Sequence, residues 1–457
     1  MKTYSFPRGG ISLEDPTVPR DDSRETAFLP ALSVIPLARH PGGTVEALVS
    51  AGDLVREGML VGRGRPGESA NVHSPVPGRV LRVARWEDGE GRVCEGLLVR
   101  MEGSFDRLGA PEEDRFPDHM WNLMDYGELA EALEDCGIVD MEGSGGPLEP
   151  VLAAFRRHRG PKTLVARCVF DDPWLAADRV LCLERADAVV EGAFMTAAAC
   201  GGGTCANGEG AAANGGGAGV LFAVTANDRK IGEALLAASA AQGLSARAIY
   251  TGCRYPQRNA REMGLALREH AKRTKTDPGL VLALGPATLA AVRDAVRYRR
   301  PILERYVAVG GSAVREPKIV RSRIGKRIGE LFDECGGLVE GPLRVVSGSP
   351  FFGERVRHLD EPVTRTCHAV AAVLRTRSGG GPERGCISCG ECRRVCPVAL
   401  DPEEMYKRIR AFAGVGPSAH HPGFRECHGC GCCEIVCPSR LPLPDVIRGR
   451  TPGGTRV

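Results

Sequence analysis

A cysteine repeat near the carboxyl end constrains this chain most strongly. Residues 386–397 read Cys-x-x-Cys-x-x-Cys-x-x-x-Cys-Pro, and residues 427–438 repeat this spacing. Three cysteines at this spacing bind one face of an iron–sulfur cube, whereas the fourth, which precedes the proline, binds the neighbouring cube. The repeat therefore predicts two [4Fe-4S] clusters, each with ligands from both copies.

The crossed arrangement assigns four cysteines to each cluster. The first set is Cys386, Cys389, Cys392 and Cys437, and the second set is Cys427, Cys430, Cys433 and Cys396. Structural zinc is the alternative, because Cys-x-x-Cys pairs also bind zinc. Zinc needs neither a third cysteine at the same short spacing nor the proline, so the spacing favours clusters. Cys432 is a ninth thiol in this stretch, and we expect it to be a spectator rather than an alternative ligand.

The other half of the 18 cysteines is scattered without metal-ligand spacing. Most of these residues are expected to be small buried side chains. Cys200 and Cys205 lie at the start of a glycine-rich segment, residues 201–219, which we expect to be a mobile surface insertion because it has almost no bulky side chains. A metal site at these two cysteines is a further hypothesis.

Charge and hydropathy exclude several classes of protein. The formal net charge is only +3, so nucleic-acid binding is not indicated. No apolar run approaches the ~20 residues that cross a bilayer. The first residues also lack the apolar core of a signal peptide. We expect no direct membrane span and no export by a signal of its own.

The fold class expected is a multidomain α/β protein. Residues 1–103 combine short apolar strands with turns at residues 52–58 and 74–80, which resembles the barrel-sandwich hybrid fold of biotinyl and lipoyl carriers. After Lys2, the next lysine is Lys162, so no prosthetic group can be attached through an amide in this lysine-free domain. We expect a structural or docking version of the fold, with His73 as a structural histidine.

A polar linker is expected over residues 104–124, and an α/β domain over residues 125–300. Helical periodicity predicts helices near residues 148–156, 231–241 and 260–273 and from about residue 288, and apolar runs predict strands at residues 163–169, 220–224 and 281–284. Alternation of this kind predicts a layered sheet. A glycine-rich loop, residues 143–147, precedes the first of these helices and could present backbone N–H groups to a phosphate. A plain turn is the alternative.

A small β-grasp (SLBB-like) module is expected over residues 301–360, with a helix at residues 325–335 that ends at two glycines. Residues 293–327 hold eleven Lys or Arg and three acidic residues, a local charge of +8. This stretch is either a solvated face or a docking surface for an acidic partner or a phosphate. Beyond Pro362 a helix is expected, followed by an α-helical ferredoxin-type domain with two clusters over residues 380–450.

The order of these parts resembles the C subunit of the Rnf ion-translocating electron-transport complex. The resemblance covers nearly the whole chain and includes short motifs: Phe6 with Gly9-Gly10-Ile11, Ile35-Pro36-Leu37 with His40, Tyr255-Pro256-Gln257, Leu303-Glu304-Arg305, Cys335-Gly336-Gly337 and the turn at residues 350–353. It implies a peripheral subunit on the cytoplasmic face of the cell membrane. Other Rnf-type membrane and iron–sulfur subunits are the implied partners.

Members of this family resemble the flavin subunit of respiratory complex I. The resemblance therefore implies that FMN takes a hydride from NADH and that electrons pass through two [4Fe-4S] clusters. The implied FMN site comprises Gly143, Gly145, Gly146, Arg167 and Asp178. This sequence departs from the family loop, because Asp140 and Glu142 replace glycine-rich positions and Arg167 replaces an asparagine. The sequence leaves open whether the chain is an NADH-oxidising electron-transfer subunit or a flavin-less relay or docking scaffold.

Overall fold

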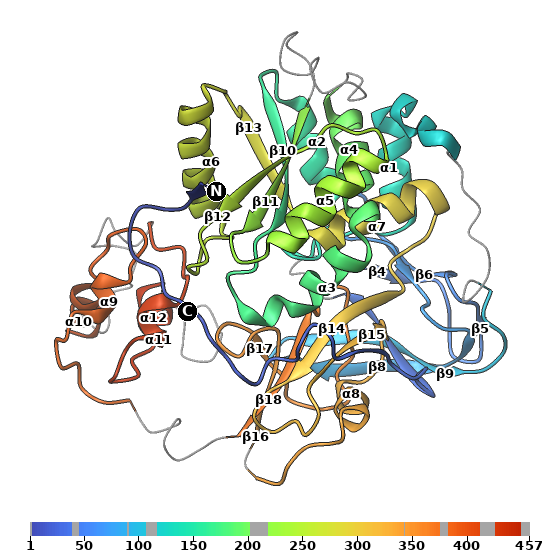
Figure 1. Ribbon diagram of the computed structural model, residues 1–457. Helices are drawn as coiled ribbons and strands as arrows, with labels where there is room; N and C mark the ends of the chain where they lie inside the picture. The colour runs from blue at the N-terminus through green and yellow to red at the C-terminus, as the bar shows by residue number, and fades with distance from the viewer. Residues whose placement is uncertain are drawn as a thin grey trace.

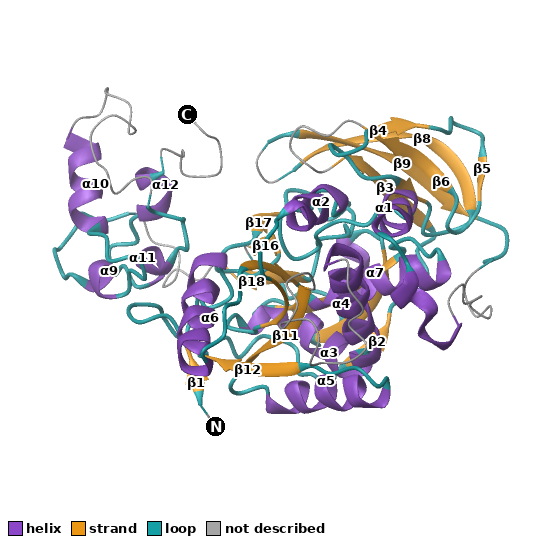
Figure 2. Ribbon diagram, turned by 90° about the horizontal axis from the view of Figure 1, so that it is seen from above, coloured by secondary structure: helices purple, strands orange, loops and turns teal. Residues whose placement is uncertain are grey.

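The computed structural model describes residues 2–38, 45–88, 91–106, 117–201, 218–341, 343–374, 383–411 and 426–448. These residues form a β-sandwich, an α/β domain, a mixed-sheet module and a small helical domain that carries the cysteine repeat (Figure 1). The sandwich and the cysteine-repeat domain lie at opposite ends of the molecule in both views (Figures 1 and 2). The two larger modules lie between them.

The amino-terminal sandwich consists of two sheets. One has the order β3 (Leu32–Ala38), β9 (Val93–Met101), β8 (Gly78–Glu87) and β5 (Leu54–Val55), and the other has the order β4 (Val45–Ala47), β6 (Leu60–Gly64) and β7 (Val72–His73). Alternate side chains face inward and form a core that includes Ile35, Val61 and Leu97. The expected barrel-sandwich domain is therefore confirmed.

The α/β domain is built on a five-stranded parallel sheet. The spatial order is β1 (Thr3–Tyr4), β12 (Arg247–Thr251), β11 (Ala218–Thr225), β10 (Lys162–Cys168) and β13 (Leu280–Leu284). In chain order, β10, β11 and β12 are added one after another toward one edge of the sheet. The next strand in the chain, β13, is added on the opposite side of β10. The carboxyl ends of β10 and β13 therefore mark the point where the strand order reverses, which is where such sheets bind ligands.

Helices cover both faces of this sheet. One face packs against α1 (Tyr126–Asp135), α2 (Glu149–Arg157), α4 (Ala186–Gly201), α5 (Arg229–Ala241) and α7 (Pro286–Tyr298). The other face packs against α6 (Ala260–Thr274). Successive strand residues alternate between the faces, so that Leu164 joins the first core and Val165 joins the second. The sequence predicted α2, α5, α6 and α7 but not α4, whose side chains are buried on every side.

The mixed-sheet module has the strand order β17 (Glu354–Arg355), β16 (Leu343–Ser347), β18 (Ala369–Leu374), β14 (Glu304–Gly310), β15 (Lys318–Arg323) and β2 (Arg24–Thr26). Its helix is α8 (Ile328–Glu334), which buries Leu331 and Phe332 against the sheet. Helix α3 (Ala176–Glu184), which follows the short η2 turn (Pro173–Leu175), packs on the other side. Strands β2 and β18 lie outside the residues expected for this module.

Two expectations about local structure are wrong. The segment after Pro362 forms strand β18 rather than a helix, because it pairs on both sides, with β14 and with β16. A central strand buried on both faces has a continuous apolar sequence, which periodicity cannot distinguish from a buried helix. The expected linker also ends in a 3-10 helix, η1 (Pro117–Leu123), whose Trp121 is buried and donates to Glu191 at 2.9 Å.

The basic stretch at residues 293–327 does not form an unpaired cationic face. Ten of its eleven cations form ion pairs with carboxylates, many of which come from distant parts of the chain. Arg323, for example, reaches Glu57 of the sandwich at 2.7 Å, and both side chains are buried. These pairs join the modules, and the docking surface considered for this stretch is not supported.

Residues 383–411 and 426–448, the described part of the cysteine-repeat domain, contain four short helices: α9 (Glu391–Arg394), α10 (Pro402–Ala411), α11 (Cys432–Ile435) and α12 (Leu443–Ile447). Helices α9 and α11 occupy equivalent positions in the two copies of the repeat. Each follows a glycine in the left-handed region, Gly390 with φ 75° and Gly431 with φ 79°. A glycine tolerates this conformation without steric cost, so both copies turn in the same way between their second and third motif cysteines.

Candidate cluster sites and the central cavity

The four cysteines expected to bind the first cluster line one small cavity. Cys386, Cys389 and Cys392 come from the first copy of the repeat, and Cys437 comes from the second. Apolar side chains, including Leu441 and Leu443, complete the wall. Cys389 is exposed, so this cavity borders the surface of the protein.

The four cysteines expected to bind the second cluster line a separate cavity. Cys427, Cys430 and Cys433 come from the second copy, and Cys396 comes from the first. The structure thus brings together both crossed sets. Sets of four thiols within apolar walls fit iron–sulfur cubes, whose ligands are cysteine thiolates.

Cys432 lines the second cavity as well, but its sulfur also contacts the carbonyl oxygen of Tyr255 at 3.9 Å in the α/β domain. Its hydrogen bond to the Cys430 sulfur lowers the pKa of Cys430 to about 7, although burial opposes this shift. A lower thiol pKa favours the thiolate form that metals bind. Cys432 is itself buried between the second cavity and the α/β domain.

The remaining cysteines lie elsewhere. Cys253 is half-buried, and the others that the structure describes are buried: Cys94, Cys136, Cys168, Cys182, Cys200, Cys335 and Cys367. Cys205 and the rest of the glycine-rich segment from residue 202 to 217 lie outside the described residues. Within the described part of the chain, no three His, Cys, Asp or Glu side chains are grouped as a site for a single metal ion.

Several family motifs converge on the second cysteine cavity. The Gly10 N–H donates to the Val395 carbonyl at 2.8 Å, and a Cβ atom on Gly9 would lie 2.6 Å from the Cys396 carbonyl oxygen. Only glycine fits so close an approach, at a φ of 68°. The amino-terminal segment is therefore packed directly against a predicted cluster ligand.

Two aromatic rings form the next part of this interface. Tyr255 and Phe352 are stacked with ring centroids 4.5 Å apart. A Cβ atom on Gly431 would lie 2.7 Å from the Phe352 ring, so the ring packs directly on the cysteine repeat. The motif at residues 255–257 and the turn at residues 350–353 thus meet at the second cysteine cavity.

His428 adds a polar contact between the same two domains. Its Nε2 atom lies 3.2 Å from the buried carboxylate of Glu262, and Asn259 lies 3.5 Å from Nδ1. The hydrogen bond to Glu262 raises the pKa of His428. The second cysteine cavity is therefore held against α6 and the loop before it.

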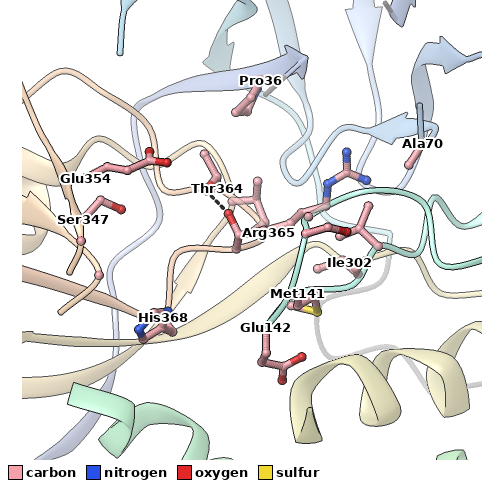
Figure 3. Close-up of a pocket in the computed structure, with 18 of the residues that line it drawn as sticks. Pro36, Ala70, Met141, Glu142, Ile302, Ser347, Glu354, Thr364, Arg365 and His368 are labelled. Carbon is pink, nitrogen blue, oxygen red and sulfur yellow. Dashed lines mark hydrogen bonds between the residues drawn. The ribbon is translucent and has the colours of Figure 1, made fainter. Parts of the chain in front are cut away.

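A larger cavity of about 620 Å³ lies between the sandwich, the α/β domain and the mixed-sheet module. Figure 3 shows part of its wall, with Pro36 and Ala70 from the sandwich, Met141 and Glu142 from residues 140–147 (from here on, the glycine-rich loop), and Ser347 and His368 from the mixed-sheet module. Tyr255 and Phe352 also line it. The same aromatic pair therefore lines this cavity and packs against Gly431 and Cys432 in the wall of the second cysteine cavity.

The glycine-rich loop beside this cavity is a self-contained turn. Six of the seven N–H groups from residue 140 to residue 146 donate within the chain: those of Asp140, Met141, Gly143, Ser144, Gly145 and Gly146. The Asp140 side chain accepts from Ser144 at 3.2 Å and fills the space above Gly143, where a Cβ atom would lie 1.8 Å from the carboxylate. These N–H groups already have acceptors, so they are not free to bind a phosphate. The loop therefore does not form the phosphate site that the sequence suggested.

Glu142 lies at the start of α7, beside the carboxyl end of β13. Its carboxylate accepts from the Ala287 N–H at 2.6 Å, from the Thr288 N–H at 3.3 Å and from the Thr288 hydroxyl. Figure 3 shows the side chain directed at the end of that helix. The carboxylate thus takes the place of an anion at the helix amino terminus, at the point where the strand order reverses.

Arg167 and Asp178, which are also implied in the FMN site, form contacts within the chain. Arg167 is enclosed and donates to the Glu142 carbonyl at 3.1 Å, and Asp178 forms a buried ion pair with Arg305 at 3.2 Å. Both residues line the cavity together with Gly143 and Gly145, whereas Gly146 is not part of its lining. The implied residues are therefore brought together. Asp178 and one terminal nitrogen of Arg167 have partners within the chain, whereas the buried Arg167 Nε has no hydrogen-bond partner.

Sequence reasoning missed three charged groups near this cavity: Arg258, Arg365 and Asp171. Arg258 and Arg365 line the cavity. Asp171 is buried, accepts from the Arg258 N–H at 3.0 Å and has a second carboxylate oxygen without a hydrogen bond. Burial raises the pKa of Asp171 to about 6. No local motif marks these residues, because the three modules meet only in the folded chain.

Comparison with known proteins agrees with this architecture. Residues 5–104 match the family described as "RnfC Barrel sandwich hybrid domain", residues 306–358 match "NQRA C-terminal domain" and residues 384–441 match "4Fe-4S dicluster domain". The C subunit of the ion-translocating oxidoreductase complex of Rhodobacter capsulatus is 30% identical over 90% of this chain and 76% of its own length. The chain belongs to this family of C subunits. The Rnf resemblance and the iron–sulfur character of the carboxyl-terminal domain are thereby confirmed.

Two further similarities complete the comparison. The C subunit of the proton-translocating ferredoxin:NAD(+) oxidoreductase complex of Clostridium ljungdahlii is 26% identical over 87% of this chain and 83% of its own length. The crystal structure of an air-oxidized NAD+-reducing [NiFe]-hydrogenase aligns with a TM-score of 0.46 at 14% identity, covering 66% of this chain and 56% of that one. Among the residues described in this Rnf-family chain, no helix has the length and apolar character needed to cross a membrane.

Proposed function

We propose that this protein is the electron-transfer subunit of a membrane-bound Rnf-type NADH/ferredoxin oxidoreductase coupled to ion transport. The observation that carries the proposal is the sorting of eight cysteines into two separate cavities, each with three thiols from one copy of the repeat and one from the other. The relatives named as C subunits of ion-translocating oxidoreductase complexes support it.

The two cysteine sets would each hold one [4Fe-4S] cluster. When bound, such clusters supply one-electron transfer. The chain's own residues supply the surroundings: mostly apolar walls line both sets, and the Gly9–Gly10 segment and the Tyr255–Phe352 pair fix the second set against the rest of the protein. Second-sphere packing of this kind tunes cluster potentials.

The positions of the two cysteine sets indicate which set lies next to an electron donor and which lies next to another subunit. The second set lies beside the aromatic pair that lines the central cavity, whereas the first set includes the exposed Cys389. We infer that a donor bound in the cavity lies next to the second set and that the surface around Cys389 faces another subunit. The other Rnf-type membrane and iron–sulfur subunits are the proposed partners, and they would hold this chain on the cytoplasmic face of the membrane as a peripheral subunit.

A flavin-less relay is the second candidate, and the glycine-rich loop favours it. In this candidate the loop takes no FMN phosphate, because Asp140 and Glu142 already satisfy the loop and the first turn of α7. A carboxylate at a helix start also repels a phosphate dianion. NADH oxidation by this chain would then require that FMN is held by other groups of the cavity.

An anaerobic reductive titration followed by electron paramagnetic resonance tests the proposal. The purified full-length chain should show two cluster signals, each of which accounts for about one electron. Adding NADH separates the two candidates, because only a chain that binds the redox nucleotides itself passes NADH electrons to the clusters without another subunit. A chain that takes up no electrons from dithionite would refute electron transfer through this subunit.

A further inference from the structure

Arg365 lies in the segment between β17 and β18 and reaches into the central cavity (Figure 3). Its Nη1 atom donates to two carbonyl oxygens, that of Asn71 in the sandwich at 3.0 Å and that of Gly137 at the base of the glycine-rich loop at 2.7 Å. The side chain is half-buried in the cavity wall, and this burial lowers the pKa of Arg365 to about 10. Within the described part of the chain no carboxylate forms an ion pair with Arg365, whose hydrogen bonds go to these two carbonyl groups.

The acidic side chains that line the cavity do not fill this role. Glu142 is bound at the start of α7, Asp178 is paired with Arg305, and Asp172 accepts from the Trp174 N–H at 3.0 Å. Glu354 also lines the cavity, but no ion pair or hydrogen bond joins it to Arg365 among the described residues. The carboxylates near the cavity therefore leave the charge of Arg365 uncompensated.

A partly buried cation without a counter-ion is unfavourable, because its lost hydration is replaced only by dipoles. A guanidinium can hold a phosphate through two parallel hydrogen bonds, and two carbonyl groups already fix the orientation of Arg365. We propose that Arg365 binds the phosphate of a nucleotide-sized ligand in the central cavity. This inference rests on the proposed function, since it names the anchor for the donor that the cavity would hold.

The remaining lining of the cavity fits the rest of such a ligand. A volume of about 620 Å³ lies within the usual range for sites of this size. The cavity lining includes hydroxyl groups that could contact a sugar: Ser347, Ser349, Thr364 and Thr366. It also includes apolar and aromatic side chains that could contact a planar ring: Met141, Ile302, Tyr255 and Phe352. In this arrangement Arg365 replaces the glycine-rich loop as the anion site.

Paired probes test the phosphate contact directly. Binding to the anaerobic full-length chain is measured by calorimetry for FMN against riboflavin, for NADH against dihydronicotinamide riboside, and for inorganic phosphate. At least one phosphorylated nucleotide should bind about 10- to 100-fold more tightly than its phosphate-free partner, the range expected for a hydrogen-bonded ion pair. Arg365→Gln should remove this difference, and Arg365→Lys should retain part of it. Arg315→Gln, a change at an exposed arginine, is the matched control and should leave the difference unchanged.

Three results would overturn the inference: equal affinities for the phosphorylated and phosphate-free partners, no nucleotide binding at all, or a phosphate preference that survives in folded Arg365→Gln. Binding of inorganic phosphate without binding of either nucleotide would also contradict it. Iron content and cluster spectra report separately on the proposed function, so loss of ligand binding with intact clusters refutes only the role of Arg365. If Arg365→Gln does not fold, Arg365→Lys decides, because an unchanged phosphate preference in that variant would contradict the two-bond contact.

Discussion

Glu142 offers a direct test of how the glycine-rich loop is closed. In Glu142→Ala, the first turn of α7 loses its acceptor for the Ala287 and Thr288 N–H groups and for the Thr288 hydroxyl. A capping side chain contributes about 0.5–2 kcal/mol, and a negative charge at a helix start adds about 0.3–1 kcal/mol. We therefore expect the opening of this turn to become about 1–3 kcal/mol easier. Glu142→Gln should cost about 1 kcal/mol or less, because the amide oxygen can still accept a hydrogen bond.

Hydrogen exchange measures this local opening. Amides at the start of α7 and in residues 140–146 should exchange about 5- to 150-fold faster in Glu142→Ala, since each 1.4 kcal/mol corresponds to a factor of ten. Exchange in the sandwich and in the cysteine-repeat domain should not change. Glu340→Gln, at an exposed position, is the matched control. Unchanged exchange at the start of α7 in Glu142→Ala would show that the carboxylate does not cap this helix.

Three further changes test other parts of the structure. Cys437→Ala should disrupt the cluster of Cys386, Cys389 and Cys392 while the other cluster keeps its resonance signal; loss of the other signal instead would contradict crossed ligation. In the folded chain the pKa of Asp171 is about 6, above its usual value near 4. The buried carboxyl group is therefore tolerated in its protonated form, and the stability of the folded chain falls as the pH rises from about 4 through 6 and the group becomes charged. Asp171→Asn should therefore raise the melting temperature more at pH 8 than at pH 4.5, and equal shifts would refute the burial of an unsatisfied carboxylate. Asp178→Ala leaves Arg305 buried and unpaired, so it should cost about 3–5 kcal/mol of stability in thermal or denaturant unfolding. A small loss in that variant would mean that the ion pair is not structural.

The cluster domain could be predicted almost entirely from the sequence, because each ligand set depends on short spacings. Three cysteines two residues apart reach one site whatever the rest of the chain does, and a proline fixes the turn after the fourth. Three of the five strands of the α/β domain, β10, β11 and β13, were also predicted closely, whereas β1 and β12 were not. In β10, alternate residues serve two cores. Local periodicity was sufficient for these elements.

Other features depend on contacts that no local pattern records. Helix α4 is buried on all sides and so lacks an amphipathic period, and β18 reads as a helix or a strand until its two neighbours are known. The charge of residues 293–327 is neutralised by carboxylates such as Glu57 and Glu191 from distant segments. The sequence placed acids in the glycine-rich loop, but only the structure pairs Glu142 with the start of α7.

Iron and acid-labile sulfide analysis, combined with Mössbauer spectroscopy on anaerobically purified full-length chain, tests the central claim most directly. The cysteine sets of the two cavities predict about eight iron and about eight sulfide per chain, in two cubes of the same type. A preparation that contains about two zinc ions and no sulfide would contradict the account, because the same cysteines would then serve a structural role without electron transfer.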